Sequence, residues 1–435
     1  MSRPSFRAEP GGALAGEITI PGDKSVSHRA MMLGAIADGT TEVEGFLDSE
    51  DCLATLGAMR AMGVAIERPA ATRVRVRGVG LDGLSAAPAA LDMGNAGTAM
   101  RLSMGLLAGQ RFDSTLVGDA SLSRRPMERA AAPLRRMGAR IETSAGRPPV
   151  RVRGGAALHG IDVELAVPSA QVKSAILLAG LYAEGRTRVR ERAVTRDHTE
   201  RMLRAFGVPV ESAPGAATLE GGARLAAAAI RVPGDISSAA FFLVAATLAA
   251  SGVFVIRDVG VNPTRTGVLE ILKLMGADIR QINLRRFGDE PVADLEVRAR
   301  ELSGIEVPPA LVPLAIDEFP VLFVAAAAAR GTTVVSGAEE LRVKESDRIA
   351  VMAEGLAALG VAAEPRPDGL VIEGGPIGGG RIDSHGDHRI AMAFAIAALV
   401  ASAPIEVQDV ANVATSFPGF AALAQRAGLR IEARP

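Results

Sequence analysis

The chain repeats one short pattern six times, and this repeat limits what the chain can fold into. Each copy ends an amphipathic segment with a glycine, and strand-like sequence follows, as in LRRMGARIE at 134–142. Glycine just past a helix adopts the left-handed conformation of a C-terminal cap, and alternation with period two is typical of a strand. The glycines of the six copies are Gly63, Gly138, Gly207, Gly276, Gly360 and Gly428.

A second helix recurs along the chain and is apolar nearly all round, as in FPVLFVAAAAARGTTVVSG at 319–337. Such a helix is buried. Six units, each with a buried helix, an amphipathic helix and several short strands, predict a chain of the α/β (α+β) class. We expect two domains of three units, with three buried helices packed beneath outer sheets in each. The other segments of this kind lie at 28–45, 171–189, 238–256 and 388–407.

Two nearly identical turns divide the chain in half: PGDKSVSHR at 21–29 and PGDISSAAF at 233–241. We interpret them as the crossings between the domains, with Pro and Gly fixing tight turns. The expected domains are therefore residues 22–232 and residues 1–21 plus 233–435, with GEITI near the N-terminus completing a sheet of the second domain. Lys24, His28 and Arg29 have no counterpart in the second copy. This indicates that the turn itself has a structural role and that these charged residues have a functional one.

Composition excludes several classes of protein. The net charge of −1 over 435 residues predicts no nucleic-acid or membrane partner. The single cysteine, Cys52, excludes a disulfide framework and a cysteine zinc site. The first twelve residues lack the apolar core of a secretory signal, so we expect a cytoplasmic protein. The most apolar run, 239–250, is shorter than the roughly 20 residues that span a bilayer, and it predicts a buried helix.

The first half carries several candidate anion-binding motifs. GDKSVSHR fails as a P-loop because Asp23 precedes Lys24, which leaves a cation, a hydroxyl and Arg29 at a helix start. A solvated helix cap is the alternative. GNAGTAMR at 94–101 is either a plain loop or a glycine-rich turn that lets a ligand approach the backbone. SRRPMER at 123–129 offers an arginine fork for carboxylate or phosphate, or an ordinary surface pair.

The second half supplies carboxylates as well as cations. In IDEFP, Asp317 and Glu318 precede a buried run, as helix caps or as a base tuned by its surroundings. VKESDR at 343–348 places Lys344 and Arg348 four residues apart, on one face of an expected helix, where a solvated face is the alternative. GDHRIAM at 386–392 places a histidine and an arginine, not expected in the core, before another apolar helix. No metal-ligand spacing appears, and these sites suit small, multiply anionic substrates in a cleft between the domains.

Ten motifs, in order along the chain, resemble the 5-enolpyruvylshikimate-3-phosphate (EPSP) synthase family. The resemblance implies the enolpyruvyl transferase fold, with two domains of three βαβαββ units and the active site in the cleft between them. SAQVKS, IDEFP and EELRVKESDR resemble the bacterial subgroup called class II. The ten motifs are PGDKSVSHR, GNAGTAMR, SRRPM, SAQVKSA, TRDHTE, NPTRTG, IDEFP, RVKESDR, GDHRIAM and ATSFP.

The resemblance also implies two substrates, no cofactor, no metal and a monomer. The residues implied for shikimate 3-phosphate are Lys24, Ser25, Arg29, Ser169, Ala170, Gln171, Arg196, Asp317 and Lys344. Those implied for phosphoenolpyruvate are Lys24, Asn95, Gly97, Arg125, Gln171, Arg348 and Arg389. Two positions depart from many members: Thr415 stands where they have a lysine, and Ala170 where they have a second serine.

The implied reaction joins the 5-hydroxyl of shikimate 3-phosphate to C2 of phosphoenolpyruvate and releases phosphate. Asp317 is our candidate base for the hydroxyl, while Glu345 and Lys24 are the candidates for proton transfer at C3, and His388 is a further catalytic candidate. UDP-N-acetylglucosamine enolpyruvyl transferase is an alternative with the same fold, but it needs a cysteine in the loop 118–126, which has none. A non-enzymatic repeat scaffold is the other alternative, and it predicts charges spread evenly over the six units.

Overall fold

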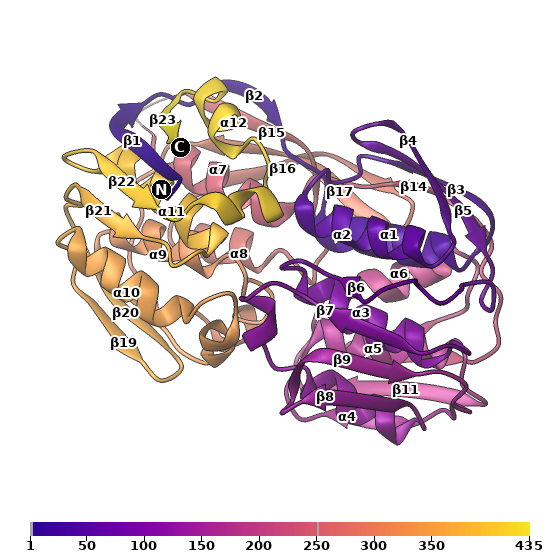
Figure 1. Cartoon of the computed structure of the whole chain (residues 1–435). Helices are drawn as coiled ribbons and strands as arrows, with labels where there is room; N and C mark the ends of the chain where they lie inside the picture. Colours follow the sequence, from indigo (N-terminus) through magenta and orange to yellow (C-terminus); the bar gives the residue numbers. More distant parts are fainter. Residues whose placement is uncertain (1–2, 250–251) are drawn as a thin grey trace. The chain divides into compact units, whose positions relative to one another are not determined.

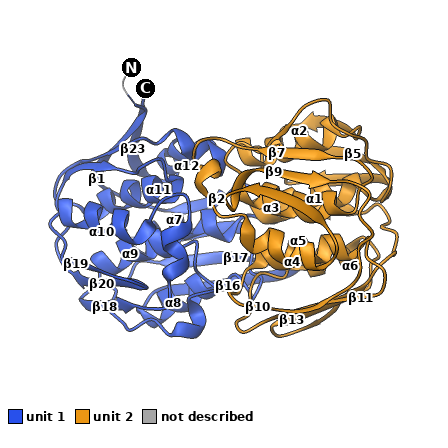
Figure 2. Cartoon of the chain, turned by 60° about the horizontal axis from the view of Figure 1, so that its bottom comes forward, with its two compact units in different colours: residues 1–21, 233–285, 291–435 blue, residues 22–232, 286–290 orange. Residues whose placement is uncertain are grey.

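A computed structural model describes residues 3–249 and 252–435, and the chain forms two compact units (Figure 2). Unit 1 comprises Met1–Pro21, Pro233–Arg285 and Pro291–Pro435, and unit 2 comprises Gly22–Val232 and Arg286–Glu290. The expected domains differ from these units at 286–290, which belong to unit 2. The end of the apolar run expected at 239–250 lies outside the described residues.

Twelve α-helices occur among the described residues, and they alternate between buried and amphipathic along the chain. Figure 1 labels these helices in the fold. The buried set is α1 (Lys24–Ala35), α3 (Gly97–Ala108), α5 (Ala170–Gly180), α7 (Ile236–Leu248), α9 (Phe319–Ala327) and α11 (His388–Ala397). The amphipathic set is α2 (Glu50–Ala61), α4 (Glu128–Arg136), α6 (His198–Ala205), α8 (Gly267–Leu274), α10 (Arg348–Ala358) and α12 (Phe420–Arg426). Within residues 3–249 and 252–435, no helix has the length and apolar character that a membrane crossing requires.

The six repeated glycines follow the amphipathic helices, as the sequence predicts. Each has a positive φ, between 80° and 103°, which favours glycine over residues with a Cβ. The helix α3 is the sixth buried helix, and its segment was not among the five named from the sequence. It packs closely on α5, because a Cβ on Gly105 would lie 2.0 Å from the carbonyl oxygen of Ala175.

Three small sheets belong to each unit, and along the chain the first four repeats follow the order βαβαββ. Among the described residues the fifth repeat has no strand before α9, and in the sixth the strand that completes the sheet comes from the N-terminus. The sheets of unit 2 are β14 (Ala229–Arg231), β3 (Asp38–Glu44), β5 (Arg73–Val79), β4 (Ala65–Ala70); β6 (Leu91–Asp92), β7 (Ser114–Val117), β9 (Arg147–Arg153), β8 (Arg140–Ser144); and β10 (Asp162–Leu165), β11 (Arg186–Glu191), β13 (Ala216–Glu220), β12 (Glu211–Ala213). Those of unit 1 are β16 (Asp278–Phe287), β17 (Glu290–Arg298), β15 (Val253–Gly260), β2 (Gly16–Thr19); β18 (Gly331–Val335), β20 (Gly369–Gly374), β19 (Ala363–Arg366); and β21 (Gly380–Asp383), β22 (Ile405–Gln408), β1 (Ser5–Gly12), β23 (Leu429–Arg434).

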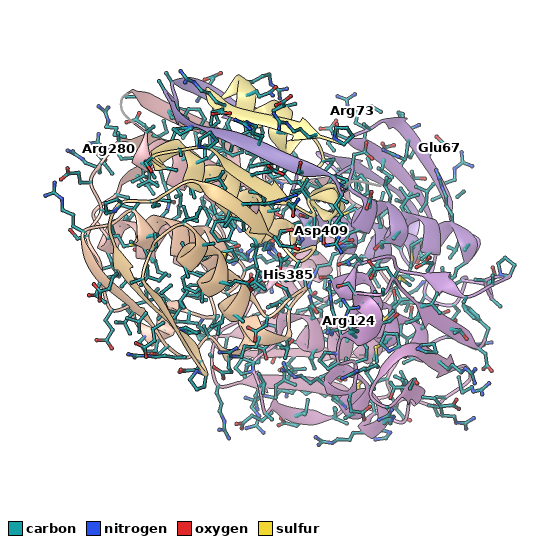
Figure 3. The ribbon with its side chains drawn as sticks, turned by 60° about the vertical axis from the view of Figure 1, so that its left-hand side comes forward. Glu67, Arg73, Arg124, Arg280, His385 and Asp409 are labelled. Carbon is teal, nitrogen blue, oxygen red and sulfur yellow. The ribbon has the colours of Figure 1, made fainter. Side chains whose placement is uncertain are left out.

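Each sheet has one apolar face and one charged face. On β5, Val74 and Val76 are buried, while Arg73 is exposed. Glu67 on the neighbouring β4 is also exposed, and both charged side chains are labelled in Figure 3. Because successive residues of a strand point to opposite faces, this alternation turns the valines toward the helices and the charges toward solvent.

Two strands are exchanged at the repeated PGD turns. Strand β2 precedes α1 in the chain but pairs in parallel with β15 of unit 1, with Ile18 opposite Ile256. Strand β14 precedes α7 but pairs in parallel with β3 of unit 2, with Ile230 opposite Val43. The turn is therefore repeated because each copy carries the chain from a strand of one unit to a buried helix of the other.

Both turns use their aspartate in the same way. Asp23 accepts a hydrogen bond from the backbone N–H of Val26 at 2.8 Å and caps α1. Asp235 accepts one from the N–H of Ser237 at 2.8 Å and caps α7. An aspartate at this position satisfies an N–H group that the helix leaves free, so the shared letters of the two turns have a structural role.

Candidate active site

The start of α1 holds Lys24 in an ion pair with Asp51, at the start of α2. The Lys24 side chain is 20% exposed and that of Asp51 is 4% exposed. Sequence analysis missed Asp51, although an acidic residue in the first turn of a helix is a recognisable signal. The pair keeps the lysine at the helix start, where backbone N–H groups also attract anions.

Arg29, one turn further along α1, is buried and extensively hydrogen-bonded. Its Nε donates to Thr199 Oγ1 at 2.6 Å, Nη2 to Ser174 Oγ at 2.7 Å and Nη1 to the Ser25 carbonyl at 2.9 Å. Burial lowers the pKa of Arg29 to about 10, so it remains a cation at neutral pH. Three of its five N–H groups are engaged, and the side chain is fixed in place without substrate.

His28, in the same motif, is buried and neutral. Its Nδ1 lies 2.7 Å from Thr55 Oγ1. Burial, followed by the charges of Lys24 and Arg29, lowers the pKa of His28 well below its usual value. His28 therefore adds no positive charge to this helix start at pH 7.

The glycine-rich turn before α3 joins Asn95 to Arg125. The amide oxygen of Asn95 accepts a hydrogen bond from Arg125 Nη2 at 2.5 Å, and its nitrogen donates to Asp119 at 2.7 Å. Arg125 is buried, whereas its neighbour Arg124, labelled in Figure 3, is exposed. The alternative of an ordinary surface pair is therefore wrong for Arg125, which faces inward toward the turn, whereas Arg124 faces solvent.

Gln171, the second residue of α5, connects that helix to α3. Its Oε1 accepts from Arg101 Nη1 at 2.6 Å, and its Nε2 donates to Thr98 at 2.9 Å. Ser169 caps α5, with Ala170 as the first helical residue. Arg101 was not among the candidate residues, although it closes the motif GNAGTAMR, and it also donates to the Pro126 carbonyl at 2.9 Å. Together these contacts bring the starts of two buried helices to one cluster.

A buried cluster of ion pairs supports the N-terminus of α5. Lys173 lies 3.0 Å from Glu191 and 3.0 Å from Glu200. Although burial opposes the charged form, the carboxylates of Glu200 and Glu191 raise the pKa of Lys173. Glu191 also accepts from the Ser169 N–H at 2.9 Å and from Thr195, the residue before Arg196. The cluster thus fixes both the cap of α5 and the turn that carries Arg196.

In unit 1, two cationic side chains form ion pairs with one carboxylate oxygen of Asp317. Lys344 Nζ lies 3.2 Å from Asp317 Oδ1, and Arg348 Nη1 lies 3.5 Å from the same atom. The expected helical face shared by Lys344 and Arg348 is wrong, because Lys344 follows a 3₁₀ turn and α10 begins at Arg348, capped by Asp347. The two cations meet at a carboxylate, not on a helix surface.

Arg348 is almost fully buried between carboxylates. Its Nε donates to Asp387 at 2.8 Å and its Nη2 to Glu345 at 2.6 Å. Although burial opposes the charge, the carboxylates of Asp387, Glu345 and Asp317 raise the pKa of Arg348. Arg348 is therefore a permanent cation. Asp387 also caps α11, so one carboxylate orients the start of that helix and Arg348 together.

The residues at the start of α11 differ in exposure. His388 is buried, so the expectation that it stays out of the interior is wrong. The Arg389 side chain is 13% exposed, and its Nη1 lies 3.9 Å from Glu318. Neither carboxylate of IDEFP caps α9: Glu318 occupies the capping position without a side-chain hydrogen bond to the helix, and Asp317 is paired with cations. The capping alternative is therefore excluded for both.

Thr415 stands where many family members have a lysine, and its side chain is uncharged. It is buried and its hydroxyl donates to the Asn412 carbonyl at 2.7 Å. Within the residues that the structure describes, no group of three or more His, Cys, Asp or Glu side chains could hold a metal ion.

Comparison with known proteins identifies this arrangement. The family model described as "EPSP synthase (3-phosphoshikimate 1-carboxyvinyltransferase)" matches residues 8–423. A protein of that name from Alkalilimnicola ehrlichii is 63% identical over 98% of this chain and 96% of its own length. One from Methylococcus capsulatus is 61% identical over 98% of both chains. A solved EPSP synthase from Acinetobacter baumannii superposes with a TM-score of 0.89 and 56% identity, over 99% of this chain and 100% of that one.

The repeated units and the close structural match define an enolpyruvyl transferase fold. Within that class, the chain belongs to the EPSP synthase family. The resemblance expected from its ten motifs is therefore confirmed, and so is the predicted fold class.

Proposed function

We propose that the chain transfers the enolpyruvyl group of phosphoenolpyruvate to the 5-hydroxyl of shikimate 3-phosphate. The observation that carries the site assignment is the Asp317 carboxylate with Lys344 and Arg348 on one oxygen. The two cations hold this carboxylate in place, and a carboxylate is a group that can accept the proton of the attacking hydroxyl. The hydroxyl oxygen then bonds to C2 while C3 takes a proton, and the resulting ketal phosphate loses phosphate and a C3 proton.

The cationic side chains of both units suit substrates that carry two phosphates and two carboxylates in total. For phosphoenolpyruvate we propose the Asn95–Arg125 pair, the buried Arg348 and the partly exposed Arg389. For shikimate 3-phosphate we propose the start of α1 with Lys24, and the start of α5. Because hydrogen bonds fix Arg125 and Arg348 before substrate arrives, these two cations can stabilise developing charge without reorganising. The full proposed sets are those given above for the two substrates.

Proton transfer at C3 is proposed for Glu345 and Lys24. Glu345 accepts a hydrogen bond from Arg348 and is 19% exposed, and Lys24 is paired with Asp51. Each is a titratable group that an ion pair holds in place. A general acid or base must be positioned in this way to transfer a proton. His388 is proposed as a further catalytic residue. We also propose a cytoplasmic monomer without a cofactor.

A phosphate-release assay with purified protein tests the proposal. Phosphate should appear only when phosphoenolpyruvate and shikimate 3-phosphate are both present. UDP-N-acetylglucosamine in place of shikimate 3-phosphate is the matched control, and it should release none. The loop 118–126 has no cysteine, and burial raises the pKa of Cys52 and keeps it a thiol. Release with the nucleotide sugar, or with neither acceptor, would contradict the proposal.

A further inference from the structure

Glu318 is a buried carboxylate that the proposed reaction does not use. Its side chain is 1% exposed, and it stands directly after the proposed base, Asp317. It makes no capping hydrogen bond to α9. Burying a carboxylate without a partner is costly, so its position calls for a cation.

Three groups converge on one oxygen of Glu318. The Ser237 hydroxyl donates to Oε1. Arg265 Nη2 and Arg389 Nη1 each lie 3.9 Å from the same atom, at ion-pair distance. Among the described residues, Glu318 is the carboxylate that forms an ion pair with Arg389. This carboxylate is therefore placed to attract the Arg389 guanidinium.

Residues of the second PGD turn also hold the Glu318 carboxylate in place. Arg265 is 3% exposed, and its Nη2 donates to Asp235 at 3.1 Å and to Ser237 at 2.7 Å. Ser237 in turn donates to Glu318. The second copy of the turn, which lacks the cations of the first, is thus more than scaffold: Asp235 contacts Arg265, and Ser237 contacts Glu318, the ion-pair partner of Arg389.

We propose that Glu318 is a positioning residue that orients Arg389 toward the anionic substrate. The inference rests on the proposed binding of phosphoenolpyruvate by Arg389. Arg265 and Ser237 fix Glu318 from one side, and Glu318 fixes Nη1 of Arg389 from the other. Electrostatic attraction is stronger in the buried, low-dielectric surroundings of Glu318 than in water, so one ion pair can restrain a long side chain.

The test compares Glu318→Gln with the wild type in steady-state kinetics. The amide keeps the shape and the contact with Ser237 but removes the charge that attracts Arg389. We expect the KM for phosphoenolpyruvate to rise about tenfold, because a displaced binding group loses much of its contribution. The KM for shikimate 3-phosphate and the kcat should change less than threefold. Ser237→Ala, which removes the hydroxyl that holds Glu318, should raise the same KM about threefold, and it carries the test if Glu318→Gln does not fold.

Two further variants separate the possible outcomes. Asp294→Asn removes another buried, arginine-paired carboxylate of unit 1 and should lower stability while leaving both KM values unchanged. Arg389→Lys should raise the KM for phosphoenolpyruvate. If Arg389→Lys does so and Glu318→Gln does not, the positioning role alone is overturned. If neither does, the proposed binding by Arg389 fails as well. A Glu318→Gln variant that only unfolds at lower temperature, or that binds phosphoenolpyruvate more tightly, also overturns the inference.

Discussion

Arg124 and Arg125 are neighbours in sequence but have opposite environments. Arg125 is buried against Asn95, and Arg124 is exposed. Arg124 ends a 3₁₀ turn, and Arg125 is in extended conformation, so their side chains leave the backbone in different directions. Two adjacent arginines therefore do not point to the same place. The backbone conformation at each residue decides whether its guanidinium faces the interior or the solvent.

At Asp317, the proposed base can be tested by a single substitution. Asp317→Asn keeps the size of the side chain but cannot accept the proton, and a positioned base contributes about 10²–10⁴-fold to the rate. We expect kcat to fall by that factor, while the Kd for shikimate 3-phosphate, measured by calorimetry, stays within about tenfold, because one ion pair with Lys344 is lost.

Asp347→Asn is the matched control for this change. Asp347 caps α10 and pairs with Arg342, and asparagine caps a helix about as well as aspartate. Its kcat should equal that of the wild type. A kcat for Asp317→Asn above about a tenth of the wild-type value would show that another group takes the hydroxyl proton.

Gly97 lies against two guanidinium groups. A Cβ at this position would be 3.1 Å from Arg101 Nη1 and 3.1 Å from Arg125 Nη1, which is tighter than ordinary contact. Gly97→Ala should therefore move the proposed ligand Arg125 and raise the KM for phosphoenolpyruvate several-fold. The family resemblance implies that the inhibitor glyphosate, which is slightly longer than phosphoenolpyruvate, occupies the same pocket. We therefore expect its inhibition constant to rise by about tenfold to a hundredfold, or about 1–3 kcal/mol.

Gly57→Ala is the control for Gly97→Ala, because a Cβ on Gly57 in α2 meets nothing within 4 Å. It should leave both constants unchanged and stabilise its helix slightly. Equal changes for phosphoenolpyruvate and glyphosate in Gly97→Ala would indicate general distortion, and no change for either would mean that Gly97 does not contact the site.

Sequence reasoning found the residues of the candidate site better than their partners. Lys24, Arg348 and Arg389 were chosen because cations stand at the starts of apolar helices. Their partners Asp51, Asp387 and Glu318 lie 27, 39 and 71 positions away, and one sequence without an alignment carries no signal for such pairings. Only the folded chain shows which carboxylate each cation meets.

Among the elements, the amphipathic helices were the easier to predict. The residue after each of these helices has a positive φ, which favours glycine. This local backbone constraint therefore produces the same sequence signal six times. A helix was expected after the glycine-rich turn GNAGTAMR, but α3 begins inside that motif, at Gly97, and it was not counted among the apolar helices. The start of α10 was placed too early, although Asp347 followed by apolar sequence is an N-terminal cap signal.

The sheet formed by β16, β17 and β15 contains a cross-strand cluster that should make stability depend on pH. Asp294 on β17 pairs with Arg285 on β16 and Arg257 on β15. Although burial opposes ionisation, hydrogen bonds, led by the one from Arg285, lower the pKa of Asp294. A carboxyl group with a lowered pKa in the folded state stabilises that state above its unfolded pKa of about 3.9 and loses this effect as the pH falls.

Asp294→Asn should therefore lower the free energy of unfolding at pH 7 by about 1–3 kcal/mol, and the difference from the wild type should shrink below about pH 4. Urea unfolding between pH 3 and pH 7 measures this. Asp113→Asn changes an exposed carboxylate whose pKa Arg153 also lowers, and it should change the profile far less because solvent screens an exposed ion pair. A difference between Asp294→Asn and the wild type that is constant over the whole pH range would mean that Asp294 contributes by packing and not by charge.

For the whole molecule, the decisive feature is that the proposed ligands of one substrate are divided between the units. Lys24, Ser169 and Arg196 belong to unit 2, whereas Asp317 and Lys344 belong to unit 1. The chain passes from one unit to the other four times, after residues 21, 232, 285 and 290. Neither unit is a continuous piece of sequence, so the complete chain is the form in which substrate binding should be measured.

Hydrogen exchange in the presence of shikimate 3-phosphate tests this division. The first N–H groups of a helix have no partner within the helix, so they exchange readily until a bound anion accepts their hydrogen bonds. We therefore expect slower exchange at the starts of α1 and α5 in unit 2, and also around Asp317 and at residues 344–348 in unit 1. Saturating ligand stabilises the native state by about 2.7 kcal/mol at 100 times Kd, so protection at these sites must exceed the change elsewhere in each unit. Inorganic phosphate at the same concentration is the control for anion binding alone. Protection confined to one unit would show that the other unit contributes nothing to this substrate, and it would contradict the proposed roles of the residues in that unit.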